Sequence, residues 1–136
     1  MRPALYIETT IPSYLTARPS RDIVFHAAQQ ITRDWWDTRR FEYDLYVSQV
    51  VLEESADGDP DAARRRLAAI DAIPHLPVTP ACADLAKVLS EAIRIPERAF
   101  ADALHISIAT VHRVPYLLTW NCAHLANATL RPLIES

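Results

Sequence analysis

Glycine is almost absent from this 136-residue chain, which holds Gly58 alone against ten prolines. Phosphate-binding loops and dinucleotide fingerprints need several glycines, because only glycine lets the backbone come so close to a phosphate. The sequence therefore excludes a P-loop enzyme and a dinucleotide-binding enzyme of the usual kind.

Cysteine and long apolar runs are scarce as well. Cys82 and Cys122 are too few for a disulfide framework, which predicts reduced thiols. The chain opens MRPALYIETT, without a cationic leader and its apolar run, and no stretch approaches the roughly 18 apolar residues that span a bilayer. We expect a soluble, cytoplasmic protein with no membrane partner.

An excess of positive charge is also missing, since 14 Lys and Arg face 17 Asp and Glu for a net charge of -3. Proteins that bind nucleic acid through bulk charge usually have a basic excess. Contact with RNA would have to use local patches, of which Arg39–Arg40 and Arg64–Arg66 are the best. A solvated helix face is the simpler interpretation, and phosphate contact through Arg64 and Arg65 is the sharper alternative.

The composition is that of one globular domain over residues 1–136, with 50% hydrophobic and 23% charged residues. The apolar run at 4–7 predicts a strand buried on both faces, and those at 44–47 and 116–118 predict two more strands. The prolines around 76–78 allow only a short edge strand. Strands that alternate with helices are typical of the α/β class with a parallel sheet.

Helix signals occupy the segments between these strands. Ser20 is the expected N-cap of a helix to about Arg39 that buries Val24, Ala28, Ile31 and Trp35. The other expected helices begin near Pro12, Ser48, Pro60, Pro80 and Glu97, and a short one covers 122–126.

Four polar residues fall where the carboxyl ends of the parallel strands should meet. Glu8 follows the first strand and Asn121 follows the last. Asp102 lies near the start of the helix that leads into the last strand, and Glu54 lies within about two turns of the helix that leaves the second strand. Sites in open α/β sheets form at this edge, so we expect these side chains to converge.

Clustered carboxylates repel one another unless a cation neutralises them, and Mg²⁺ or Mn²⁺ prefers such oxygen ligands. A metal there would suit phosphodiester hydrolysis. Glu54 is favoured over Glu53, because it follows Val50 and Val51 on the inward helix face. Taken singly, each acid also has an ordinary interpretation as a cap, a turn or a surface residue.

Four segments resemble the PIN-domain family, particularly the VapC-like toxin ribonucleases of type II toxin–antitoxin systems. They are YIETTIPSYL at 6–15, VSQVVLEE at 47–54, DALHISIA at 102–109 and LLTWN at 117–121. The resemblance extends over nearly the whole chain. It implies a three-layer α/β/α sandwich with a central, mainly parallel sheet of four or five strands.

The resemblance also implies a ribonuclease that depends on Mg²⁺ or Mn²⁺, often a homodimeric toxin held inactive by a small antitoxin protein. Glu8 and Asp102 would bind metal directly or through water. Glu54 would hold metal-bound water or assist its deprotonation, and Asn121 would orient water or an acid.

Three further residues are candidates for supporting the site. Thr9 and Thr119 would donate hydrogen bonds to it. His105 shares a helix face with Asp102, so it can bond an acid or contact substrate, although a satisfied buried histidine is the simpler interpretation.

The sequence departs from the family pattern in two places. The first acid is usually Asp, and Glu8 is one methylene longer. Family members often continue into another strand after the last motif, so here either that strand is missing or residues 130–134 supply a short substitute.

Two remaining features have weaker interpretations. Cys122 and His124 suggest a thiol or zinc site, but zinc needs more ligands than these. Trp35 and Trp36 are adjacent and point in different directions, so one should enter the core and the other is free for a dimer or antitoxin interface.

Three functions follow from these observations. The leading hypothesis is a metal-dependent endoribonuclease that acts as a toxin. The second is a catalytically weak or inactive PIN-like scaffold that binds RNA or dimerises. The third is a nuclease for DNA or RNA processing, because the same acids would cut either nucleic acid.

Overall fold

A computed structural model describes residues 1–93 and 99–121 of the chain. The helix expected at 122–126 and the strand expected at 130–134 lie outside the described residues, as do Cys122 and His124.

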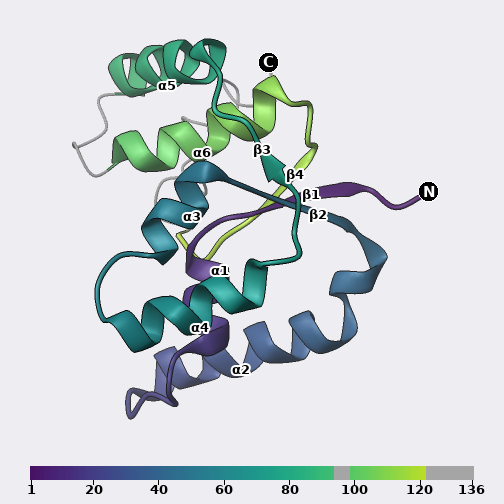
Figure 1. Ribbon diagram of the computed structural model, residues 1–136, viewed down its shortest axis with the longest axis vertical. Helices are drawn as coiled ribbons and strands as arrows, with labels where there is room; N and C mark the ends of the chain where they lie inside the picture. The colour runs from purple at the N-terminus through teal and green to yellow at the C-terminus, as the bar shows by residue number, and fades with distance from the viewer. Residues whose placement is uncertain (94–98, 122–136) are drawn as a thin grey trace.

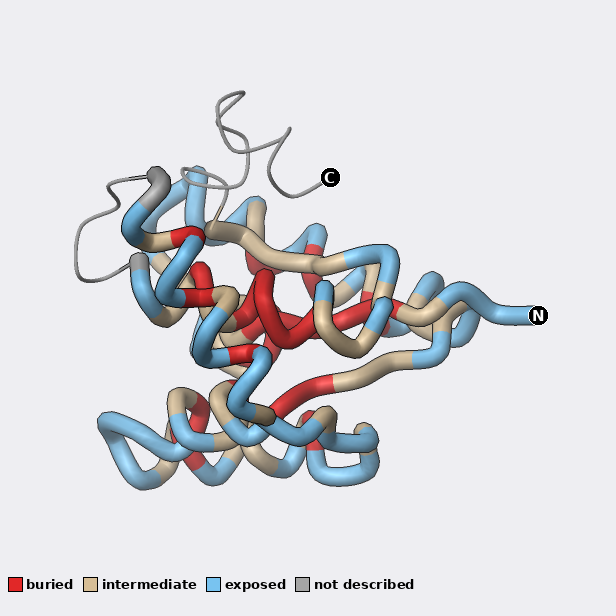
Figure 2. The backbone as a smooth tube through the Cα atoms, turned by 90° about the horizontal axis from the view of Figure 1, so that it is seen from above, coloured by how far each residue is buried: buried red, intermediate tan, exposed pale blue. Residues whose placement is uncertain are grey.

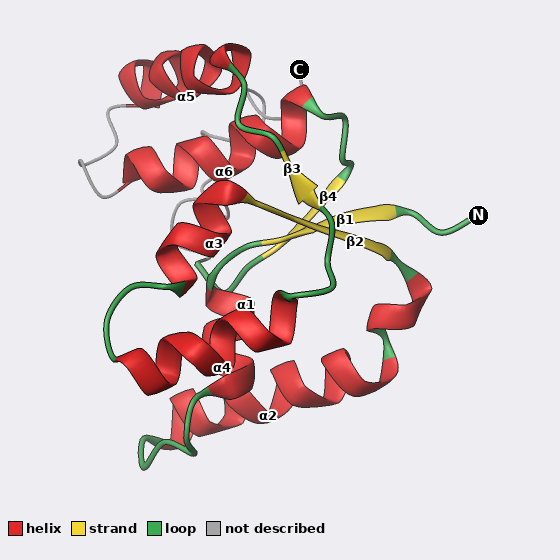
Figure 3. Ribbon diagram, in the orientation of Figure 1, coloured by secondary structure: helices red, strands yellow, loops and turns green. Residues whose placement is uncertain are grey.

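The centre of the fold is a parallel sheet of four strands in the described part of the chain (Figure 3). The strands are β1 (Ala4–Ile7), β2 (Asp44–Ser48), β3 (His75–Leu76) and β4 (Tyr116–Leu118). Their order is β3-β2-β1-β4, and every neighbouring pair is parallel. The two central strands are therefore β1 and β2, and the proline-flanked β3 lies at an edge as predicted.

Helices cover the sheet from two sides (Figure 1). The pair α5 and α6 lies on one side, and α1, α2 and α4 lie on the other. This arrangement confirms the predicted α/β class and its layered sandwich. The bounds are α1 (Thr10–Thr16), α2 (Ile23–Thr38), the 3₁₀ turn η1 (Arg40–Glu42), α3 (Gln49–Ser55), α4 (Pro60–Ile70), α5 (Pro80–Ile93) and α6 (Ala99–Val111).

Two predicted helix starts are confirmed, and one is wrong. Ser48 accepts a hydrogen bond from the Val51 amide, and Pro60 begins α4 as predicted. Ser20 is not the N-cap of α2. Asp22 is the cap, because it directly precedes the first helical residue and its carboxylate reaches the amide of Phe25.

The predicted apolar face of α2 is only partly confirmed, because Trp35 packs against the core but two other members do not lie inward. Val24 and Ile31 are 79% and 57% exposed, whereas Gln29, Thr32 and Trp36 are buried. Gln29 bonds the backbone of the loop that precedes α2, and Thr32 accepts a hydrogen bond from the indole of Trp120. Tertiary partners satisfy these polar groups, so burying them costs little.

Of the two adjacent tryptophans, Trp36 is the buried one, and Trp35 is half-buried. One of them therefore enters the core, as predicted. A role for Trp35 in a dimer or antitoxin interface stays a prediction.

The core follows the sheet and the inner sides of the helices (Figure 2). Its largest fully buried apolar side chains include Tyr6, Ile7, Val47, Ile70 and Ile108. None of the helices within 1–93 and 99–121 has both the length and the hydropathy of a membrane span.

A pair of matched substitutions tests this assignment of the core. Ile108, in α6, is fully buried, and Ile31 lies mid-helix in α2 but is 57% exposed. We expect Ile108→Ala to lower the free energy of unfolding by about 2–5 kcal/mol, because it leaves a cavity. Ile31→Ala should change it by no more than about 0.5 kcal/mol. Urea denaturation measures both, and equal losses would contradict the assignment.

Candidate functional site

The strand order places two distant parts of the chain side by side at one edge of the sheet. The chain passes from β1 to β2 and β3 on one side and then returns to β4 on the other side of β1. The order thus reverses between β1 and β4, and ligand sites of open α/β sheets lie at the carboxyl ends of the strands at such a point. The Glu8 amide donates to the Leu118 carbonyl at 3.1 Å, which continues the pairing of β1 and β4 to this edge.

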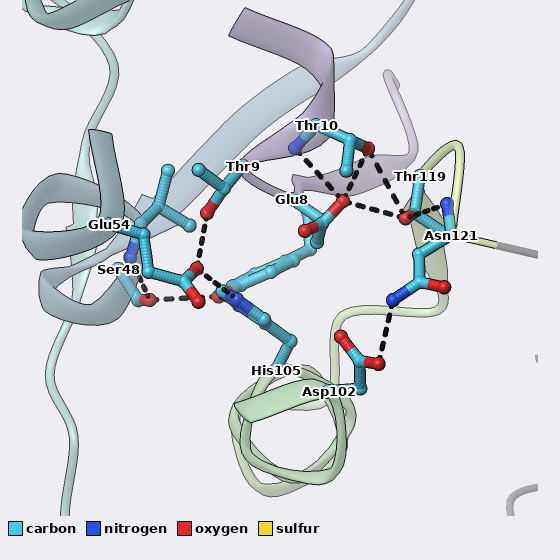
Figure 4. Close-up of polar contacts among 11 residues, drawn as sticks. Glu8, Thr9, Thr10, Ser48, Glu54, Asp102, His105, Thr119 and Asn121 are labelled. Carbon is cyan, nitrogen blue, oxygen red and sulfur yellow. Dashed lines mark hydrogen bonds and ion pairs between the residues drawn. The ribbon is translucent and has the colours of Figure 1, made fainter. Parts of the chain in front are cut away.

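Glu8 is buried at that edge, with 6% of its surface exposed. Its Oε1 accepts three hydrogen bonds: one from the Thr10 amide at 3.1 Å and two at 2.6 Å from the hydroxyls of Thr10 and Thr119 (Figure 4). All three donors bond the same oxygen. The carboxylate is therefore fixed in orientation, and Oε2 is left for another partner.

Glu54 lies on α3, the helix that follows β2, and its carboxylate is held in a similar way. Its Oε1 accepts hydrogen bonds from the Thr9 hydroxyl at 2.5 Å and from Nε2 of His105 at 2.7 Å. Glu53 is exposed and bonds Gln49 instead. The structure thus brings Glu54, and not Glu53, into the site.

The hydrogen bonds of Glu54 set its acidity. Burial acts to raise the pKa of this carboxyl, but the hydrogen bonds from His105 and from the Thr9 hydroxyl lower it further. The pKa of Glu54 therefore lies below its ordinary value, and the group is ionised at neutral pH.

His105 lies between Glu54 and the sheet. It is 2% exposed, and its Nδ1 lies 2.6 Å from the Tyr6 hydroxyl. The sequence left open whether His105 bonds an acid or is only a satisfied buried histidine. Both descriptions hold, because the ring is buried and its Nε2 bonds Glu54.

Asp102 and Asn121 meet on the other side of the site. The Asn121 amide donates to Oδ2 of Asp102 at 2.7 Å. Both residues line a narrow hollow of about 10 Å³, comparable with the space that one water molecule needs. The rest of its lining is Glu8, His105, Ile106, Leu117 and Thr119.

Within the part of the chain that the structure describes, the group of side chains that could hold a metal ion differs from the predicted set. One ligand atom each from Glu8, Glu54 and His105 lies within 4.8 Å of the others. The sequence favoured Glu8, Glu54 and Asp102, of which Asp102 lines the adjoining hollow. An imidazole therefore joins two carboxylates in this cluster, and ligation by Asp102 stays a prediction.

Three residues of this network were missed by sequence analysis. Thr10 donates twice to Glu8, and Tyr6 and Ser48 continue the hydrogen bonds of His105 into the core. Thr10 had a weak signal, as a hydroxyl two residues after an acid. Tyr6 had none, because it lies within an apolar run that predicts only a strand.

The predicted RNA contacts lie elsewhere. Arg65 donates to the Thr16 carbonyl and pairs with Asp61, and Arg64 is exposed and pairs with the same carboxylate. Neither arginine lines the hollow beside Glu8. Arg65 instead joins α4 to the end of α1, and phosphate contact by either residue stays a prediction.

The chain has a layered α/β fold with a group of acidic side chains at one edge of its parallel sheet, and a similar fold occurs among solved structures. The chain resembles a chain in the crystal structure of VapBC2 from Rickettsia felis bound to a DNA fragment from its promoter. The TM-score is 0.58 at 14% identity, covering 90% of this chain and 91% of the other. The likeness shows a shared fold. No protein-family model and no curated protein sequence matches the chain.

The lowered pKa of Glu54 has a measurable consequence for the metal-free protein. A carboxyl whose folded-state pKa is depressed stabilises the fold above its unfolded-state pKa of about 4.3, and this contribution is lost as the pH falls through the folded-state value. Glu54→Gln lacks that contribution. We expect the wild type to have a higher free energy of unfolding than this variant at pH 7, and we expect the difference to be smaller at pH 3.

Urea denaturation in a chelating buffer at the two pH values measures this difference. Glu53→Gln, one residue away and exposed, is the control. A gap between the wild type and Glu54→Gln that does not narrow in acid would contradict the assigned pKa direction.

Proposed function

We propose that this protein is a metal-dependent endoribonuclease that cuts RNA phosphodiester bonds and acts as the toxin of a toxin–antitoxin pair. The observation that supports this most is the cluster of Glu8, Glu54 and His105, whose ligand atoms lie within 4.8 Å of one another at the point where the strand order reverses. Such a cluster beside a hollow is suited to holding a cation.

The chemistry of these residues fits Mg²⁺ or Mn²⁺. Glu8 is buried among neutral hydroxyl and amide donors, and no cationic side chain within residues 1–93 and 99–121 bonds its carboxylate. A buried carboxylate gains from a nearby positive charge. Carboxylate oxygens suit both ions. A bound ion would lower the pKa of a water molecule and stabilise charge on a phosphoryl oxygen.

The protein's own side chains would position the reactants. Glu54 is ionised at neutral pH and has one oxygen held by Thr9 and His105, so it is placed to accept a proton from an attacking water. Asn121 holds Asp102 through its amide, which leaves the Asn121 carbonyl oxygen to orient water. Glu8 and Asp102 would hold the cation between them.

The partners follow by analogy with the structural neighbour. That neighbour is a VapBC2 complex bound to DNA of its own promoter. We propose that this chain likewise pairs with a small antitoxin, which the VapBC2 likeness supports through the fold alone. From the resemblance of the sequence to VapC-like toxins, we also propose that it forms a homodimer and acts on RNA in the cytoplasm.

One observation favours the scaffold alternative. The hydrogen bonds of Glu8 satisfy one of its oxygens without any ion, so the site is stable as a purely structural network. A PIN-like protein with weak or no catalysis would then bind RNA or dimerise without metal.

A cleavage assay separates the enzyme from the scaffold. The purified protein is incubated with structured RNA, with Mg²⁺ or Mn²⁺ and with a chelator. We expect cleavage only with metal. Asp102→Ala and Glu54→Gln should each lower the cleavage rate by at least about 10- to 100-fold, which is the effect of losing a residue that supports a metal ligand. Glu53→Gln should cleave like the wild type.

Calorimetric metal binding accompanies this assay. RNA binding without metal binding or cleavage would support the scaffold. A parallel assay on single-stranded and duplex DNA tests the third hypothesis, in which RNA is not the preferred substrate.

The toxin assignment is tested in cells. We expect induced expression of the wild-type protein to arrest bacterial growth, and Glu8→Gln to abolish the arrest while accumulating to the same level. A gene for a small DNA-binding protein beside this one should encode the antitoxin, and its co-expression should restore growth. Growth arrest by Glu8→Gln would contradict a nuclease toxin.

A further inference from the structure

A chain of hydrogen bonds runs from the core of the sheet to the Glu54 carboxylate. Ser48 Oγ lies 2.8 Å from the Tyr6 hydroxyl, which lies 2.6 Å from Nδ1 of His105, whose Nε2 lies 2.7 Å from Oε1 of Glu54 (Figure 4). These residues come from β2, β1, α6 and α3. Four elements therefore meet in one polar chain.

The chemical groups at the two ends of this hydrogen-bond chain determine which atoms donate and which accept along it. Glu54 is a carboxylate, so the 2.7 Å contact needs a proton on Nε2 of His105. In neutral imidazole the other nitrogen then carries a lone pair, and it needs a donor. The Tyr6 hydroxyl is that donor, and burial raises the pKa of Tyr6 above its ordinary value, so it keeps its proton. The Ser48 hydroxyl can donate to Tyr6 in turn, while its oxygen accepts from the Val51 amide.

Burial makes this arrangement rigid. Tyr6 and Ser48 are 0% exposed and His105 is 2% exposed, so water does not compete for their hydrogen bonds. The ring of Tyr6 also packs edge-on against that of His105, with centroids 5.7 Å apart. A buried donor or acceptor without a partner is costly, so the imidazole cannot rotate away without leaving Tyr6 and Glu54 unpaired.

The effect of this chain falls on one oxygen of Glu54. Both donors, Thr9 and His105, bond Oε1, which leaves Oε2 as the oxygen available to a water or an ion. Loss of the His105 bond would leave a single hydroxyl to hold a carboxylate that is 35% exposed. The carboxylate would then sample other rotamers.

We propose that Tyr6 and His105 are positioning residues: Tyr6 fixes His105 with its proton on Nε2, and His105 fixes Glu54 with Oε2 directed into the site. Ser48 anchors the chain in the core. The catalytic consequence rests on the proposed nuclease function, whereas the arrangement of protons does not.

The proton arrangement is tested by the ¹⁵N spectrum of the His105 ring in the metal-free wild-type protein. A two-bond ¹H–¹⁵N correlation distinguishes the two ring nitrogens. We expect a proton on Nε2 and none on Nδ1, and Tyr6→Phe should shift the Nδ1 resonance, because that nitrogen loses its hydrogen-bond donor. A proton on Nδ1 in the wild type would overturn the proposal, whether or not the protein cuts RNA.

Two variants of His105 separate positioning from simple core packing. Gln places an amide N–H near the position of Nε2, whereas Asn places one near Nδ1. His105→Gln should therefore keep most of the cleavage rate. We expect His105→Asn to lower kcat by about 10- to 100-fold, with KM for RNA unchanged. Equal kcat values for the two variants, both shown folded by circular dichroism, would overturn the role of the Nε2 proton.

A matched pair of tyrosines completes the test. Tyr46 is the register partner of Tyr6 on β2, and its hydroxyl has no part in this chain. Tyr6→Phe should lower kcat by about 10- to 100-fold, while Tyr46→Phe should match the wild type. Equal kcat values for Tyr6→Phe and the wild type would overturn the role of Tyr6. If the wild type cuts no RNA with either ion, the proposed function fails. The ¹⁵N spectrum of the His105 ring then tests the proton arrangement by itself.

Discussion

The arrangement of this site depends on a carboxylate buried between two parallel strands. Glu8 lies at the carboxyl end of β1, directly beside the end of β4, and only 6% of its surface is exposed. A negative charge in such a place needs hydrogen bonds, and Thr10 and Thr119 supply them from both strand ends. The same bonds join β1, α1 and the segment after β4, so the carboxylate both requires and stabilises the convergence of these segments.

A second carboxylate repeats this pattern from the neighbouring strand. Glu54 also has one oxygen held by protein donors, from Thr9 and His105, and the other left for a partner. Two carboxylates arranged in this way present their second oxygens in fixed directions. Such preorganisation lets a site bind a cation or a water without paying to reorient its side chains. The site is accordingly better described by its hydrogen-bond donors than by its acids alone.

The fold and the positions of the acids could be predicted from local patterns. Apolar runs such as 4–7 and 44–47 predict buried strands, and the signal at Asp59–Pro60 predicts a helix start, because each depends on a few neighbouring residues. The face of α2 could not be predicted. Gln29 and Thr32 are buried because partners from distant segments satisfy them, and no hydropathy pattern records those partners.

The sequence by itself determined the α/β class, the parallel strands, and the placement of Glu8, Glu54, Asp102 and Asn121 at one edge, since each follows from its distance along the chain to a strand end. Only the tertiary structure decided how these groups pair. The contacts of Tyr6 with His105 and with Ser48 join residues that are 99 and 42 positions apart in the sequence. Hydrogen bonds require atoms to meet within about 3 Å at suitable angles. That geometry arises only when the strands and helices pack. The hydrogen bonds of Tyr6, which lies in an apolar run, can therefore be recognised only in the folded protein.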